Sequence, residues 1–307
     1  MPQLAGTDLT VSDLCLGANV FGWTADEPTS FAVLDRFFDA VPSTLRPFVD
    51  TAESYRDGES ERILGRWMAE RGTRDRMVIA TKASKLQKEH PLSAAEIRKA
   101  AEGSLERLQT DRIDLYYAHF DDETTPLDET LQAFDELVQA GKIRYAAASN
   151  YSAARLAEAL ATAKQLGVRG YVALQQHYNL MERPVYEDEL RDVVAGHGLG
   201  TFPYYGLARG FLTGKYRPGE QVDSPRAEGA ARYIGEKGDR VLAALGQIAE
   251  ELGSSMPAVA LRWLADQPTV VAPIASARSV EQLAGLLPMQ DLRLSDEQRR
   301  RLTEASS

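Results

Sequence analysis

The stretch VDTAESY holds a carboxylate, Asp50, and a phenol, Tyr55, just after an apolar run. Lys82 and His119 each close another apolar run further along the chain. Together these residues offer a carboxylate, an amine, an imidazole and a phenol. Such a set suits the transfer of a proton to a substrate oxygen.

A phenol is a poor acid at neutral pH, because its reference pKa is about 10. A neighbouring ammonium favours the phenolate and lowers that pKa, so Lys82 would help Tyr55 to release a proton. Asp50 would hold and neutralise the lysine, and His119 could donate a hydrogen bond to a carbonyl oxygen as charge develops there. Taken singly, Asp50 could cap a turn, Lys82 could be a surface cation and Tyr55 could pack against a helix. Their places at successive strand ends favour the chemical interpretation.

The elements that must position these residues alternate along the chain. Eight apolar, β-rich runs predict strands at 13–17, 47–50, 77–82, 113–119, 143–149, 171–175, 200–205 and 269–275. Apolar residues that return every three or four positions predict helices at 60–71, 93–108, 127–140, 153–166 and 185–197. Repeats of roughly 25 to 40 residues are typical of βα units, so we expect an α/β fold, a (β/α)8 TIM barrel with parallel strands. In such barrels the active site forms where the strands end.

Two segments complete this expectation. Residues 3–14 resemble a small hairpin that precedes the first barrel strand, and residues 214–239, rich in glycine, proline and charge, predict a long loop after strand seven. No low-complexity tract or second core divides the chain. We therefore expect residues 1–307 to form a single barrel domain.

Composition limits the partners. The charge is 35 − 45 = −10, which opposes a broad nucleic-acid surface and an anionic membrane. No run approaches the roughly 20 apolar residues of a membrane span, and the amino terminus lacks the regions of a secretory signal, so we expect a cytoplasmic protein. The single cysteine, Cys15, lies in an apolar run and is expected to be buried.

Several other site classes have little support. With four histidines and no HExxH or paired-cysteine spacing, we expect no metal site. The GxSxG and GxGxxG patterns are also absent, which weakens hydrolase and Rossmann interpretations.

The chain resembles the aldo-keto reductase family over almost its whole length. The family's aspartate, Thr-Ala and tyrosine pattern is present as DTAESY, its lysine matches Lys82 in ATKAS, and its histidine matches His119 in YYAHFDD. The resemblance implies an NADP-dependent oxidoreductase that reduces aldehydes or ketones to alcohols by hydride transfer. It makes Tyr55 the general acid, Lys82 and Asp50 its pKa-tuning partners, and His119 the residue that orients the carbonyl.

The same resemblance implies a site for NADPH or NADP+. It assigns Ser149, Asn150 and Gln175 to the carboxamide, Tyr204 to the nicotinamide ring, Leu207, Arg209 and Gly210 to the pyrophosphate, and Ser276, Arg278 and Gln282 to the 2′-phosphate and adenosine. Lys215 and Arg217 would add positive charge that an acidic chain needs for an anionic ligand. A guanidinium offers bidentate hydrogen bonds, so Arg278 favours NADPH over NADH.

The substrate pocket is expected to include Phe21 and Trp23, which follow the first strand at the same barrel mouth. Such a pocket favours an aldehyde or ketone with an apolar or aromatic portion. Two other functions stay open: a cofactor-binding regulatory subunit with little turnover, and a cofactor-free lyase or isomerase that uses Lys82. The pair Ser149 and Asn150 could also simply cap a following helix. The sequence does not indicate an oligomeric state.

Overall fold

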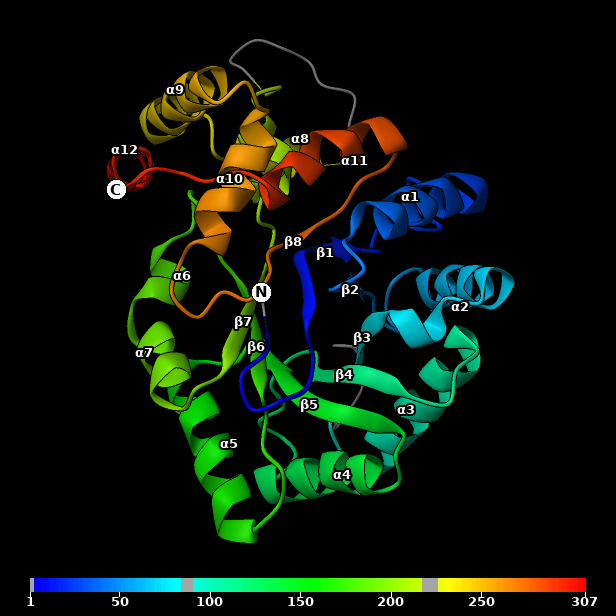
Figure 1. Cartoon of the computed structure of the whole chain (residues 1–307). Helices are drawn as coiled ribbons and strands as arrows, with labels where there is room; N and C mark the ends of the chain where they lie inside the picture. Colours follow the sequence, from blue (N-terminus) through cyan, green and yellow to red (C-terminus); the bar gives the residue numbers. More distant parts are fainter. Residues whose placement is uncertain (1–2, 84–90, 217–225) are drawn as a thin grey trace.

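The computed structural model describes residues 3–83, 91–216 and 226–307. Its parallel strands form one sheet in the order β7-β6-β5-β4-β3-β2-β1-β8. Their bounds are β1 Val11–Gly17, β2 Arg46–Asp50, β3 Val78–Ala83, β4 Ile113–Ala118, β5 Ile143–Ser149, β6 Ala173–His177, β7 Gly200–Tyr204 and β8 Ile274–Ala275. Helices alternate with these strands and surround them (Figure 1). The predicted (β/α)8 barrel is confirmed.

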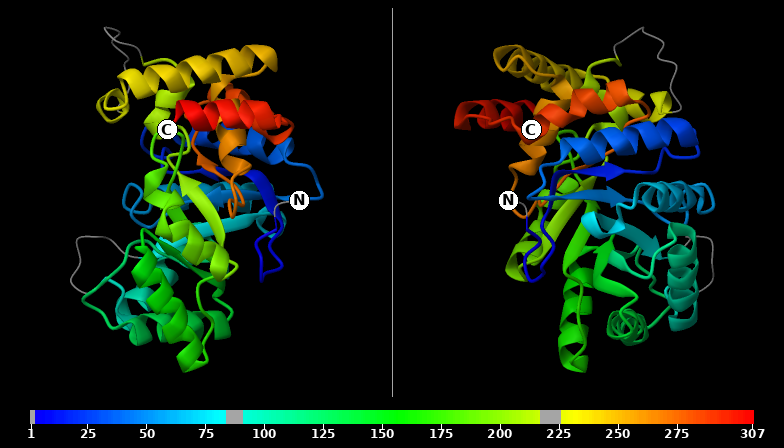
Figure 2. Two further views of the ribbon diagram at one scale, coloured as in Figure 1. Left: turned by 90° about the vertical axis from the view of Figure 1, so that its left-hand side faces the viewer. Right: turned by 45° about the vertical axis from the view of Figure 1, so that its right-hand side comes forward.

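The helices cover the outside of the barrel, and α9, α10 and α12 gather at one end of the molecule in both views of Figure 2. Their bounds are α1 Glu27–Ala40, α2 Glu59–Arg71, α3 Ala94–Leu108, α4 Leu127–Gln139, α5 Ala153–Leu166, α6 Pro184–Glu187, α7 Glu189–Gly196, α8 Ala227–Ala231, α9 Glu236–Glu251, α10 Met256–Ala265, α11 Val280–Leu286 and α12 Asp296–Ala305. Short 3-10 helices lie at η1 Arg74–Arg76, η2 Ala208–Thr213 and η3 Leu287–Gln290. Within the described ranges, none of the helices combines the length and apolar character needed to cross a bilayer.

The inside of the barrel is a packed core. Phe48 of β2 and Phe202 of β7 meet edge to face across it, with ring centroids 5.0 Å apart. Cys15 of β1 is fully buried in the same cluster, and burial raises the pKa of its thiol well above the ordinary value. A larger apolar cluster lies between strands and helices and holds Trp67 and Trp263. Helix and sheet thus share one continuous apolar layer around the barrel.

The barrel closes between β7 and the segment before β8. Thr201 donates its N–H to the carbonyl of Thr269 at 2.8 Å, and Val271 donates to the carbonyl of Thr201 at 2.9 Å. The hydroxyl of Tyr186 in α6 lies 2.7 Å from Thr201 Oγ1 and also contacts the Thr269 hydroxyl. A single bridge, between Thr201 and Val270, joins the strands at this seam.

The predicted amino-terminal hairpin is confirmed and fills the end of the barrel where the strands begin. Gln3 pairs antiparallel with Thr10, and Leu4 donates its N–H to the carbonyl of Leu9 at 3.0 Å. Leu4 and Leu9 belong to the interior cluster. Gly200 leaves room for this, because a Cβ there would lie 2.4 Å from Leu4 Cδ1. The opposite end of the barrel is left for the site.

The region predicted as one helix at 185–197 is two helices, α6 and α7, which meet at Asp188. The backbone there has ψ −126°, outside the helical range. Tyr186 in the first turn is buried, and its hydroxyl reaches the barrel seam. The expectation of continuity was wrong because this contact sets the direction of α6.

Two further elements differ from expectation. The strand predicted at 269–275 has only two residues in a ladder, because Thr269 has a left-handed φ of 69° and Pro273 has no N–H to donate. The segment predicted as a loop at 214–239 contains α8 and the first turn of α9. Its residues 217–225, with Arg217, lie outside the described residues.

Candidate active site

The ends of two strands and one loop bring a hydrogen-bonded series of proton-bearing groups together. Asp50 is the last residue of β2, Lys82 lies in β3, and Tyr55 lies on the loop between β2 and α2. Lys82 Nζ donates to Asp50 Oδ1 at 2.6 Å, to the carbonyl of Thr51 at 2.7 Å and to the Tyr55 hydroxyl at 3.2 Å. All three N–H groups of the ammonium therefore have acceptors.

This ion pair is fully enclosed by the barrel. Lys82 is 0% exposed and Asp50 2% exposed, so Lys82 is no surface cation. Gln175 in β6 donates to the second oxygen of Asp50, with Nε2 2.8 Å from Oδ2. A buried ion pair is tolerated only when its remaining polar atoms are bonded, and these contacts meet that condition.

Two opposing effects act on the pKa of the Tyr55 phenol. Burial raises this pKa above its ordinary value, while the positive charge of Lys82 lowers it, and burial prevails. The sequence-based expectation of a lowered pKa was therefore wrong for the net direction, although the effect of Lys82 has the expected sign. Burial disfavours the Lys82 ammonium, but Asp50 and Tyr55 outweigh it and raise its pKa. Tyr55 is protonated and Lys82 charged at neutral pH.

His119 directly follows β4 and faces the phenol. Its ring and the ring of Tyr55 meet edge to face, with centroids 6.2 Å apart, and Phe120 stacks on it at 4.5 Å. Burial, and then the charge of Lys82, lower the pKa of His119 well below the ordinary range, so the imidazole is neutral. Its buried Nδ1 has no hydrogen-bond partner among the described residues. A neutral imidazole can carry its one proton on the other nitrogen.

Amide and hydroxyl groups from the ends of β5 to β7 lie next to the hydrogen-bonded series of Asp50, Lys82 and Tyr55. Asn150 has a left-handed φ of 59°, and its Nδ2 donates to the carbonyl of His119 and to Ser149 Oγ, both at 3.0 Å. The Tyr204 hydroxyl donates to Asn150 Oδ1 at 2.7 Å. The residue that caps α5 is Ser152. The alternative of a helix cap for Ser149 and Asn150 is thus wrong.

These groups open onto one cavity of 990 Å³. The sequence-predicted site residues in its lining are Trp23, Asp50, Tyr55, His119, Asn150, Gln175, Tyr204, Leu207, Arg209, Gly210, Lys215, Ser276, Arg278 and Gln282. Lys82 and Ser149 are buried and are not in that lining.

Phe21 was wrongly predicted to line the substrate pocket. Its side chain is 0% exposed and packs in the apolar cluster between strands and helices, whereas Trp23, two residues later, is 42% exposed and lines the cavity. Phe21 donates its N–H to the carbonyl of Ala18 at 3.0 Å, and Gly22 follows with a left-handed φ of 70°. This tight turn directs Phe21 inward, and the sequence alone did not show which ring would face the cavity.

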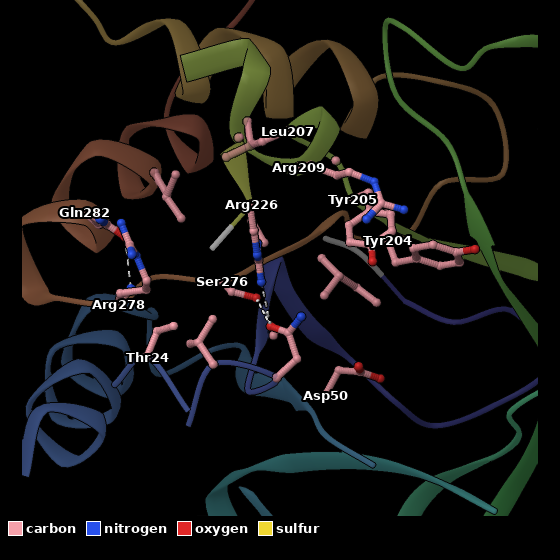
Figure 3. Close-up of a pocket in the computed structure, with 18 of the residues that line it drawn as sticks. Thr24, Asp50, Tyr204, Tyr205, Leu207, Arg209, Arg226, Ser276, Arg278 and Gln282 are labelled. Carbon is pink, nitrogen blue, oxygen red and sulfur yellow. Dashed lines mark hydrogen bonds between the residues drawn. The ribbon is translucent and has the colours of Figure 1, made fainter. Parts of the chain in front are cut away.

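The far end of the cavity, next to α11, carries polar and basic groups (Figure 3). Gln282 Oε1 accepts the backbone N–H of Arg278 at 3.0 Å, and Ser276 Oγ donates to Asn19 Oδ1 at 2.6 Å. Arg226 reaches the same Asn19 oxygen at 3.4 Å. Burial lowers the pKa of Arg226, and the neighbouring charge of Arg278 contributes to that decrease.

Asn19 and Arg226 are site residues that the sequence analysis missed. Asn19 lies two positions after β1, so the rule that sites form at strand ends could have identified it. Arg226 precedes α8 in a segment with several charges, and no local pattern distinguishes it from them. Among the described residues, no three histidine, cysteine or acidic side chains are grouped as metal ligands.

Comparison with known proteins identifies the family to which this chain belongs. A sequence profile described as the aldo/keto reductase family matches residues 13–307. The chain belongs to the aldo/keto reductase family. As a member of this family it is an oxidoreductase.

Several curated members of the aldo/keto reductase family are similar over nearly the whole chain. An uncharacterized oxidoreductase of Bacillus subtilis, YrpG, is 36% identical over 98% of this chain and 94% of its own. Norsolorinic acid reductase B of Aspergillus parasiticus is 32% identical, over 94% of this chain and 79% of its own. A probable voltage-gated potassium channel subunit beta of Oryza sativa subsp. japonica is 34% identical, over 92% and 88%. Relatives named as reductases and one named as a channel subunit thus have similar sequence identity to this chain.

Proposed function

We propose that this protein is an NADPH-dependent reductase that converts aldehydes or ketones to alcohols, with Tyr55 as the general acid. The observation that carries the proposal is the buried series of hydrogen bonds from Asp50 through Lys82 to the Tyr55 hydroxyl. Tyr55 and His119 both line a large cavity. Two relatives whose names call them oxidoreductase or reductase support it. A cytoplasmic location belongs to the same proposal and is checked by cell fractionation.

The residues of the cavity suit a nicotinamide dinucleotide. Its volume of 990 Å³ is at the upper end of the range of about 300 to 1,000 Å³ for ligand sites, as a long cofactor with a substrate requires. Asn150 and Gln175 would hold the carboxamide from the cavity lining, and Tyr204 would lie against the ring. Ser149, buried behind that lining, would support the carboxamide site by accepting the Asn150 side-chain hydrogen bond at 3.0 Å. Leu207 and Gly210 would approach the pyrophosphate.

The basic end of the cavity suits the phosphate of NADPH. Arg278 would bind the 2′-phosphate, with Ser276 and Gln282 beside it and Lys215 adding positive charge. In an acidic chain this local charge favours an anionic ligand.

The protein's own groups account for the proton side of the reaction. When bound, the nicotinamide supplies the hydride. Tyr55 donates its hydroxyl proton to the carbonyl oxygen, and the Lys82 ammonium, hydrogen-bonded at 3.2 Å, stabilises the phenolate that remains. Neutral His119 donates a hydrogen bond to the same oxygen and so orients the carbonyl.

The test is the consumption of NADPH with a panel of aromatic and aliphatic aldehydes, measured by absorbance. Tyr55→Phe should lower kcat by about 100-fold or more, because general acid catalysis contributes about 100- to 10,000-fold, while NADPH still binds. Tyr145→Phe is the matched control, since this phenol bonds to Asp8, far from the cavity lining, and turnover should stay at the wild-type value. Unchanged turnover in Tyr55→Phe would refute the acid assignment.

A regulatory subunit with little turnover is the second candidate, because the rice relative is called a probable channel subunit beta. It predicts NADPH binding, visible as quenched cofactor fluorescence, without consumption of any carbonyl in the panel. The complete set of Asp50, Lys82, Tyr55 and His119 favours the reductase.

A further inference from the structure

Arg209 differs from the other cations of the cavity in where its guanidinium lies. Figure 3 shows it beside Tyr205, on the same side as Tyr204 and Asp50, whereas Arg278 lies at the opposite end. The family resemblance assigns Arg209 to the pyrophosphate. The position of the side chain indicates a role next to the proton donor instead.

The guanidinium of Arg209 lies against the ring of Tyr205. The Cζ atom of Arg209 lies 4.2 Å from the Tyr205 ring centroid, within the range of a cation-π contact. Tyr205 itself has an uncommon left-handed φ of 53°, and Asn179 fixes it by donating from Nδ2 to its carbonyl at 2.9 Å. Tyr205 is close enough to Tyr55 to affect the pKa of that phenol. Tyr205, Arg209 and the proposed acid therefore line the same cavity.

Arg209 carries a charge that no acidic group neutralises among the described residues. None of their carboxylates forms an ion pair with it, and its buried Nε has no hydrogen-bond partner among them. Helix α8 packs on its stem, because a Cβ at Gly229 would lie 2.8 Å from Arg209 Cδ. Arg209 lines the cavity, so an anion there would bind favourably to the terminal N–H groups of its guanidinium.

The other end of the cavity has cations of its own for the dinucleotide. Arg226 reaches Asn19, and Arg278 lies next to Gln282. Arg226 is close enough to both Arg278 and Arg209 for their charges to contribute to its lowered pKa. With Arg278 and Arg226 at the dinucleotide, Arg209 would be left for a second anionic group.

We propose that Arg209 is a specificity-determining residue that binds an anionic group of the substrate, a carboxylate on the carbonyl compound. This inference rests on the proposed reductase function and names its substrate class: aldehydes or ketones that carry a carboxylate several bonds from the carbonyl. The guanidinium offers the carboxylate two parallel N–H donors, while Tyr55 and His119 hold the carbonyl oxygen.

The test compares 4-carboxybenzaldehyde with 4-methylbenzaldehyde, which have the same shape but differ in charge. Wild-type protein should have the higher kcat/KM for the carboxylate. Arg209→Met keeps the stem on Tyr205 and removes the charge, so kcat/KM for the carboxylate should fall about 10- to 100-fold with little change for the methyl compound. Arg209→Lys should restore part of the loss. The Kd of NADPH, from fluorescence quenching, should stay within about twofold.

Equal losses for both aldehydes with weaker NADPH binding would overturn the proposal and return Arg209 to the pyrophosphate. The two proposals can fail separately. If wild-type protein reduces neither aldehyde, calorimetry with 4-carboxybenzyl alcohol and 4-methylbenzyl alcohol on the NADP+-saturated protein gives a readout without turnover. Tighter binding of the carboxylate, lost in Arg209→Met, would support the anion site. Equal binding of the two alcohols would overturn it.

Discussion

At the scale of single residues, the site depends on a balance at one phenol. Burial raises the pKa of Tyr55 and Lys82 lowers it, so the hydroxyl stays protonated yet has a cation ready for its conjugate base. A general acid must be protonated before the reaction and stable as an anion after it. The ammonium supplies the second requirement without defeating the first.

Removal of the ammonium should expose this balance. Lys82→Met would leave burial and Asp50 to raise the pKa of Tyr55 further, and kcat for reduction should fall about 100-fold or more. The high-pH fall in kcat should move to a higher pH, as measured in a pH profile. Because the variant leaves Asp50 buried without its cation, the double variant Asp50→Asn, Lys82→Met controls for stability. An unshifted pH profile in both variants would contradict the proposed role of Lys82.

Arg278 should determine the choice of cofactor. Arg278→Ala removes a charge-assisted contact that only NADPH can make, so the Kd of NADPH should rise about 10- to 100-fold and that of NADH less than about threefold. Fluorescence titration with both cofactors measures this. Arg293→Ala, exposed and outside the cavity lining, is the control and should change neither Kd. Equal weakening of both would exclude Arg278 from the 2′-phosphate.

The sequence could predict the ends of strands better than the direction of turns. Asp50, Lys82 and His119 were placed correctly because alternating βα units fix which residues reach one edge of the barrel. Phe21 was not, because the tight turn from Ala18 to Phe21, followed by Gly22 with its left-handed φ, decides whether this ring faces the cavity or the core. The contacts of Asn19 and Arg226 join segments separated by 207 positions, and no local pattern carries such information.

At the scale of elements, tertiary contacts overrode local patterns in two places. The helix predicted at 185–197 splits because Tyr186 bonds at the barrel seam, and β8 is short because Pro273 cannot donate. The pattern of apolar residues predicted that a helix and a strand exist in these segments. Long-range packing determined how long each of them is.

The hairpin and β7 offer a test of how the barrel end is filled. Gly200→Ala adds a methyl group that would meet Leu4 at 2.4 Å and Val271 at 2.6 Å, so the free energy of unfolding should fall by about 1 to 3 kcal/mol. Urea denaturation measures this. Gly246→Ala in α9 is the matched control, since a Cβ there meets nothing within 4 Å and should stabilise the helix by about 0.5 to 1 kcal/mol. A further Leu4→Ala change in the Gly200→Ala background should cost less than in wild type.

At the scale of the whole molecule, stability should depend on pH through groups buried for the site. Burial lowers the pKa values of His119 and His177 in the folded protein, so the unfolded chain binds more protons below pH about 6.5. The free energy of unfolding should therefore be highest above that pH and should decrease as the pH falls towards 5.

The expected slope is at most about 1.4 kcal/mol per pH unit for each histidine. Urea midpoints at pH 7.5, 6.5 and 5.0 measure it. His119→Gln should have a shallower decrease than wild type, and His197→Gln, whose histidine is exposed, should not differ from wild type. Parallel decreases in wild type and His119→Gln would contradict the assignment.

The only cysteine lies where its reaction with a thiol reagent would detect transient opening of the barrel. Cys15 pairs with Ile274 of the two-residue strand β8, and its N–H reaches the carbonyl of Pro273 at 3.0 Å. Its thiol lies inside the ring, so a reagent such as a maleimide can reach it only after strands part. The labelling rate in native buffer thus reports how often the strands around Cys15 separate. A lower rate in the presence of NADPH would show how strongly the bound cofactor suppresses this opening of the barrel.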